Sequence, residues 1–114
     1  MKIPVSFLHT SPAAIGPLVQ YYREQAPDLE ITNQLDDGLL RLLAAGRADT
    51  VEARLHDMLG AARDVYGARL CMVTCSSVTP AIMAGLASSA GMPLFKIDYP
   101  MAAEASGPSV GLPL

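Results

Sequence analysis

The sequence repeats one local pattern three times: a short apolar run of strand length, then polar residues, then a proline. The polar residue and the proline are Ser11-Pro12, Thr79-Pro80 and Tyr99-Pro100. Serine and threonine cap helices and proline fits the first helical position, so the first two steps predict strands that lead directly into helices. Strands that alternate with helices favour right-handed crossovers and a parallel sheet. The pattern therefore predicts an α/β fold with several strand ends at one edge of the sheet.

Apolar periodicity divides the chain into four predicted strands and the helices between them. The predicted strands cover residues 3–9, 29–33, a central run from after Gly67 to Cys75, and 93–97. The predicted helices cover residues 13–25 (starting at 12 or only near 16–17), 39–45, 48–66, 80–90 and 101–105. The longest helix carries one continuous apolar stripe, formed by Val51, Leu55, Met58, Leu59, Ala62 and Tyr66. A polar loop is predicted over residues 33–38, and residues 106–114 form a tail rich in glycine and proline.

Composition excludes several classes of function. The 114 residues fit one domain, and the net charge of −3 gives no electrostatic reason to bind nucleic acid or anionic lipid. No apolar run reaches the roughly 18 residues of a membrane span, and residues 1–8 resemble a strand more than a signal peptide. Cys71 and Cys75 lie about 13 Å apart if both are on one strand, too far for a disulfide. With no metal-ligand spacing either, we expect free thiols, no metal and a cytoplasmic protein.

The parallel topology predicts a candidate site where the strands end. Ligands bind outside the carboxyl ends of the strands in open parallel sheets, and helix starts there favour carboxylates and phosphates. The residues expected near one another are His9, Thr10, Ser11, Cys75, Ser76, Ser77 and Asp98, with Asn33 and Asp36. We expect the Cys75 thiol to face open space beside the start of the next helix, whose unpaired N–H groups favour a thiolate.

Each candidate also has a structural interpretation. A lone cysteine at a strand end is often a small buried residue, and Cys71 is predicted to belong to the core. His9 could orient a substrate or simply end a strand, and Asp98 could bind substrate or cap a helix. Asp36 fits a loop or capping role, and His56 fits a solvated helix face near Glu52. Other thiol-enzyme classes fit less well, because no arginine follows Cys75 closely and no Cys-X-X-Cys pair is present.

Three segments resemble the aspartate/glutamate/hydantoin racemase superfamily. They are Val73-Thr74-Cys75-Ser76-Ser77-Val78, Lys96-Ile97-Asp98-Tyr99-Pro100-Met101-Ala102 and Asp36-Asp37-Gly38-Leu39-Leu40. The resemblance runs from the first strand to about Ala105 and covers the first of the family's two similar halves. It implies a three-layer, flavodoxin-like α/β half-domain over residues 1–105, with a four-stranded parallel sheet in the order 2-1-3-4.

The resemblance also implies a function. The family moves a proton at the carbon next to a carboxylate without any cofactor, using one cysteine from each half. Cys75 matches the first-half cysteine, while Ser76 and Ser77 stand where amino-acid racemases usually carry Asn-Thr, which leaves the substrate undefined. The implied substrate-binding residues are Thr10, Ser11 and Ser77, and we expect His9, Asp36, Thr74, Ser76 and Asp98 to line the same site.

The second cysteine of the family has no counterpart in these 114 residues. Cys71 lies further back on the same predicted strand and cannot reach the opposite face of a substrate. Three explanations follow: the chain is a fragment, two copies pair as a homodimer or higher homo-oligomer and supply Cys75 twice, or the chain has lost two-base catalysis. The predicted partner is thus a small carboxylate, and the competing hypothesis is a non-catalytic domain that binds a small anion or contributes to an assembly.

Overall fold

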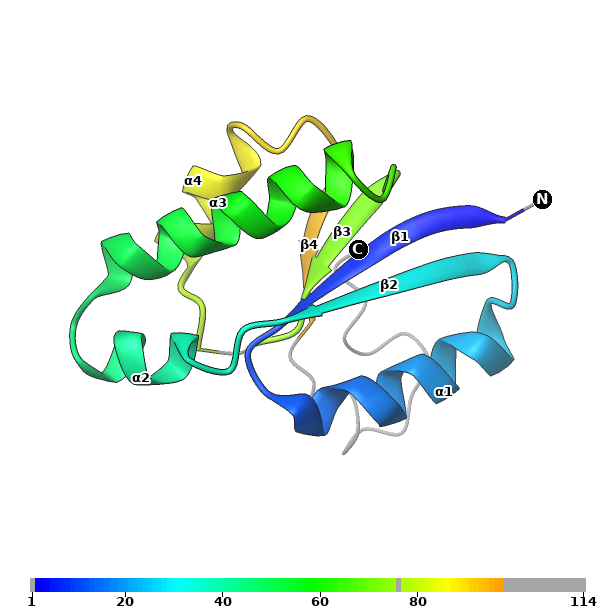
Figure 1. The fold of residues 1–114 in the computed structure, drawn as a ribbon, viewed down its shortest axis with the longest axis horizontal. Helices are drawn as coiled ribbons and strands as arrows, with labels where there is room; N and C mark the ends of the chain where they lie inside the picture. Colours follow the sequence, from blue (N-terminus) through cyan, green and yellow to red (C-terminus); the bar gives the residue numbers. More distant parts are fainter. Residues whose placement is uncertain (1, 76, 98–114) are drawn as a thin grey trace.

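Four parallel strands form the centre of the computed structural model, which describes residues 2–75 and 77–97 (Figure 1). In chain order the elements are β1 (Ile3–His9), a 3₁₀ helix (Pro12–Ala14), α1 (Ile15–Gln25), β2 (Leu29–Leu35), α2 (Leu39–Ala44), α3 (Ala48–Asp64), β3 (Leu70–Val73), α4 (Pro80–Ala87) and β4 (Leu94–Lys96). The strands lie in the order β2-β1-β3-β4, and every pairing is parallel. The predicted α/β class and strand order are confirmed, and the arrangement is consistent with a flavodoxin-like fold.

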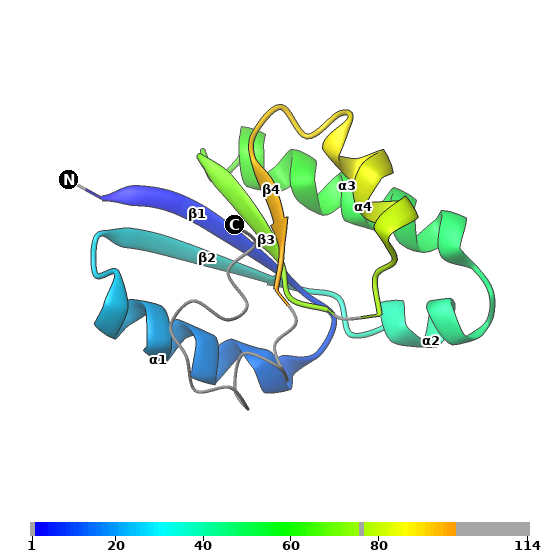
Figure 2. The same cartoon turned by 180° about the vertical axis from the view of Figure 1, so that it is seen from behind.

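The helices cover both faces of the sheet and make three layers. Figure 1 shows α1 on one side of the strands and α3 and α4 on the other, and Figure 2 shows the same arrangement from behind. Since side chains alternate along a strand, β1 serves both faces. Val5 and Phe7 pack with α1, whereas Leu8 packs in the cluster of α3 and α4.

Strand β2 is longer than the sequence indicates. The predicted strand ended at Asn33, and the predicted polar loop is wrong for Gln34 and Leu35, because these two residues continue the pairing with β1 as far as His9. The amide of Gln34 donates to Ser6 Oγ at 3.3 Å and to the Met58 carbonyl of α3 at 2.9 Å. These tertiary partners satisfy a polar side chain on the sheet and let the strand continue.

Several element ends also differ from the prediction. Helix α3 ends at Asp64, so Tyr66 is 48% exposed and does not belong to the buried stripe, while the other five predicted stripe residues are buried. Helix α4 ends at Ala87, and Ser88 folds back to donate to the Gly85 carbonyl at 2.8 Å. Gly67 has a φ of 65°, as expected after a helix end. The predicted helix at 101–105 and the tail at 106–114 lie outside the described residues.

Helix α4 begins as the sequence indicates. Thr79 is its N-cap, with the side-chain oxygen accepting from the Ile82 N–H at 3.2 Å, and Pro80 follows in the first turn. We expect Thr79→Ala to lower the free energy of unfolding by about 1 kcal/mol, because one helix N–H loses its acceptor. Urea denaturation followed by circular dichroism measures the loss. Thr79→Ser keeps the hydroxyl and should stay close to the unsubstituted protein; equal losses in both variants would contradict the capping role.

Candidate functional site

The carboxyl ends of β1, β2 and β3 carry most of the predicted site residues that the structure describes. Main-chain hydrogen bonds continue past the strand ends: the Thr74 N–H donates to the Leu8 carbonyl at 3.0 Å, and the Asp36 N–H donates to the His9 carbonyl at 3.0 Å. The loops after β2 and β3 are therefore anchored to β1 at their first residues.

A hydrogen-bonded side-chain network joins these three strands. The His9 ring lies 2.7 Å from Thr74 Oγ1 through Nδ1 and 2.7 Å from Asn33 Oδ1 through Nε2. With the Asn33 oxygen assigned to this contact, Nε2 carries the proton and donates. The Thr74 hydroxyl then donates to Nδ1 at 2.7 Å in preference to the Leu8 carbonyl, its other acceptor, which is farther away at 3.4 Å. Burial lowers the pKa of His9, while the hydrogen bond to Asn33 opposes that change. The lowered pKa favours a neutral ring at pH 7, the protonation state that this pattern of donors requires.

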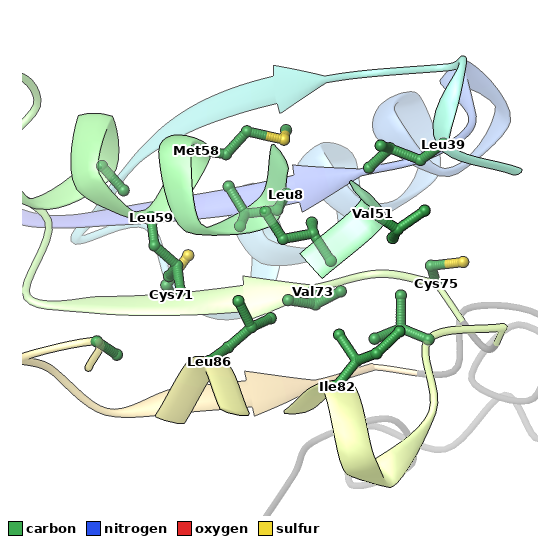
Figure 3. Packing of buried hydrophobic residues seen from close by; sticks show 14 residues of the cluster. Leu8, Leu39, Val51, Met58, Leu59, Cys71, Val73, Cys75, Ile82 and Leu86 are labelled. Atoms are coloured by element: carbon green, nitrogen blue, oxygen red, sulfur yellow. The ribbon is translucent and has the colours of Figure 1, made fainter. Parts of the chain in front are cut away.

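The Cys75 side chain lies on the other face of the sheet. It is 5% exposed and belongs to the cluster that includes Leu39, Val78 and Ile82. Figure 3 shows Cys75 beyond Val73, at one end of this cluster. The expectation of a thiol facing open space is therefore not met, because Cys75 is buried among aliphatic residues.

The sheet thus separates the predicted site residues into two groups. His9, Asn33 and Thr74 lie with Phe7 on the face covered by α1, since the His9 and Phe7 ring centroids are 5.9 Å apart. Cys75 lies on the face covered by α3 and α4. Parallel topology did bring both groups to one edge, but the pleat turns them to opposite sides.

The loop after β1 supplies two further candidates. Thr10 is buried, and extending the β1–β3 register by two residues places it beside Cys75. Ser11 accepts from the Ala13 N–H at 3.2 Å and caps the 3₁₀ helix that begins at Pro12, as the sequence predicted. Ser77 is exposed in the turn before α4. Ser76 and Asp98, also predicted for the site, lie outside the described residues.

Asp36 has structural partners. One carboxylate oxygen accepts from the Gly38 N–H at 3.0 Å, and the other accepts from Arg54 Nε of α3 at 3.1 Å. These contacts favour the loop and capping interpretation over substrate binding. Arg54 could not be predicted as a partner of Asp36, because the ion pair joins the loop before α2 to α3, a separate helix on the same side of the sheet.

The remaining titratable and thiol groups do not add a second site. Cys71 is fully buried and unpaired with Cys75, and burial raises the pKa of its thiol to about 12. Within residues 2–75 and 77–97, no three His, Cys, Asp or Glu side chains gather as a metal-binding group. In the same part of the chain, every helix is too short or too polar to cross a membrane.

Comparisons with protein-family models, with curated proteins and with solved structures find no significant match to this chain. The fold class therefore rests on the structure itself, and the function is a matter for proposal.

Proposed function

We propose that the chain is a racemase-like isomerase domain that transfers a proton, without a cofactor, at the carbon next to the carboxylate of an amino acid or related small acid. Cys75 would act as the acid/base group. The observation that supports this proposal is the position of Cys75 at the carboxyl end of the inner strand β3, in the loop that leads into the capped helix α4. This edge is where parallel sheets place their ligands.

Proton transfer of this kind requires one thiolate and one thiol, on opposite faces of the substrate. A thiolate takes the proton from the carbon and leaves a carbanion whose charge spreads into the carboxylate, and a thiol on the opposite face returns a proton. Cys71 cannot be the second group, because it is fully buried in the middle of the sheet beside Ser6 and Leu94. A second copy related by a twofold axis would supply a second Cys75, so the proposal includes a homodimer or higher homo-oligomer.

The burial of Cys75 sets a requirement on the mechanism. Its aliphatic neighbours exclude water, which protects a carbanion from unwanted protonation. They also cover the sulfur, so substrate binding has to move the loops after β1 and β3 apart. The small-acid substrate would then contact Thr10, which the strand register places beside Cys75, and Ser77, which is exposed in the turn before α4.

Exchange of solvent deuterium tests the proposal directly. We expect the intact chain in D₂O to exchange the α-proton of at least one member of a panel of amino acids and 2-hydroxy acids, measured by proton NMR. Cys75→Ala should abolish this exchange because the base is lost, whereas Cys71→Ala should retain it. Exchange that survives in Cys75→Ala, or a strict monomer with no exchange on any acid, would reject two-base isomerisation.

The same burial favours a second candidate, a non-catalytic domain that binds a small anion or contributes to an assembly. A cysteine packed against Leu39 and Ile82 is typical of a core position. Iodoacetamide labelling followed by mass spectrometry separates the two functions. The isomerase predicts native labelling of Cys75 that a dicarboxylate suppresses, and the non-catalytic domain predicts a Cys75 that stays unlabelled until the protein unfolds.

A further inference from the structure

We infer that His9 is a positioning residue that acts on Cys75 through Thr74 and makes no contact with substrate. The inference deepens the proposed function and rests on it for its meaning in catalysis. Three geometric observations support it: both nitrogens of the His9 ring are hydrogen-bonded, Thr74 is held by its main chain and by its hydroxyl, and Asn33 binds the ring from the surface side.

His9 is not placed to bind a substrate directly. Its side chain has no exposed surface, and both ring nitrogens are in 2.7 Å hydrogen bonds. A substrate oxygen would have to displace Thr74 or Asn33 to reach the ring. His9 also faces α1 with Phe7, on the side of the sheet opposite Cys75.

Thr74 links His9 to Cys75. Thr74 immediately precedes Cys75, and it is held by its main chain to Leu8 and by its hydroxyl to His9. The Cys75 carbonyl accepts from the Val78 N–H at 3.4 Å, which closes the turn on its other side. With Thr74 held toward α1, the next side chain along the extended backbone is directed to the opposite face, where the Cys75 sulfur lies.

Asn33 selects the tautomer of the His9 ring. Its oxygen accepts from Nε2, which leaves Nδ1 free to accept the Thr74 proton, so the amide selects the ring tautomer that holds Thr74. Asn33 also lines a shallow groove of about 660 Å³ between α1 and β2, together with Val19 and Arg23. Because this side chain is at the surface, it can be replaced without opening the core.

The test uses substitutions that differ by one hydroxyl. In a Cys71→Ala background, where Cys75 is the only thiol, Thr74→Val removes the bond to His9, and Thr74→Ser keeps it. We expect Thr74→Val to raise the rate of Cys75 alkylation by iodoacetamide at least fivefold, because the loop is released, and Thr74→Ser to stay within twofold of the background protein.

Urea separates release of the loop from general loss of stability. Alkylation through local opening depends weakly on low urea concentrations, whereas alkylation through global unfolding rises steeply with urea. The inference expects the weak dependence in Thr74→Val. Equal rates in the valine, serine and background proteins would overturn it, as would a steep urea dependence in Thr74→Val.

Asn33 offers a second measurement on an intact core. Nitrogen-15 NMR of the His9 ring should show a protonated Nε2 and an unprotonated Nδ1. Asn33→Leu should change that tautomer pattern and raise Cys75 alkylation, and Glu30→Leu, at an exposed position on the same strand, should change neither. A His9 spectrum unaffected by Asn33→Leu would overturn the claim that Asn33 selects the ring tautomer. These readouts need no turnover, so absence of deuterium exchange in every protein would reject the isomerase while the effect of His9 on Cys75 could still be measured.

Discussion

Replacing Phe7 with alanine is expected to lower the free energy of unfolding by about 3–5 kcal/mol, the usual cost of removing a buried aromatic ring. Phe7 lies on the inner strand β1 and has no exposed surface. Its ring makes edge-to-face contacts with Tyr22 of α1 and with His9, and the distances between ring centroids are 5.4 Å and 5.9 Å, respectively. The substitution therefore leaves a cavity between the sheet and α1, the only α-helix among the described residues that covers this face.

The control for Phe7 is an apolar residue on the neighbouring strand that packs less. Leu35, at the end of β2, is 42% exposed. Leu35→Ala should lower the free energy of unfolding by less than about 1 kcal/mol, because the leucine side chain buries little apolar surface. Urea denaturation followed by circular dichroism compares both variants, and Phe7→Leu, which fills part of the cavity, should fall between them. Similar losses for Phe7→Ala and Leu35→Ala would show that the face under α1 is not packed as described.

The sequence was most informative where structure is decided locally. The stripe from Val51 to Ala62 lies on one side of a helix by periodicity alone, and Thr79-Pro80 contains both the cap and the first helical residue. It was least informative where a distant partner decides. Strand β2 continues through Gln34 because the Met58 carbonyl on α3 accepts its amide, and no local pattern contains that contact.

The candidate site shows the same limit at the level of a single residue. Parallel topology was enough to place His9, Thr74 and Cys75 at one edge of the sheet. Which face each one occupies depends on the register that pairs Leu8 with Val73, and a shift by one residue would exchange the two faces. Sequence periodicity does not specify register between distant strands, so the separation of Cys75 from His9 could not be predicted.

Raising the pH above about 9 is expected to destabilise the fold strongly, through Cys71 on one face of the sheet and Tyr22 on the other. Burial raises the pKa of Cys71 from 9.0 to about 12 and that of Tyr22 from 10.0 to about 12. Both groups are acids whose neutral form is favoured in the folded state. The stability they contribute is therefore fully present below their unfolded pKa values and is lost as the pH rises toward 12. At about 1.4 kcal/mol per pH unit, Cys71 alone accounts for on the order of 4 kcal/mol.

Matched substitutions assign this alkaline loss to the two residues. Other titrating groups are shared by all variants, so the difference between curves isolates the replaced side chain. Cys71→Ala should flatten the fall in unfolding free energy that starts near pH 9, and Tyr22→Phe should flatten the part that starts near pH 10, where an unfolded tyrosine begins to ionise. Urea denaturation at closely spaced pH values between 7 and 11 gives the curves. If Cys71→Ala declined as steeply as the unsubstituted protein, the thiol would have to be more accessible to water than its position between Ser6 and Leu94 allows.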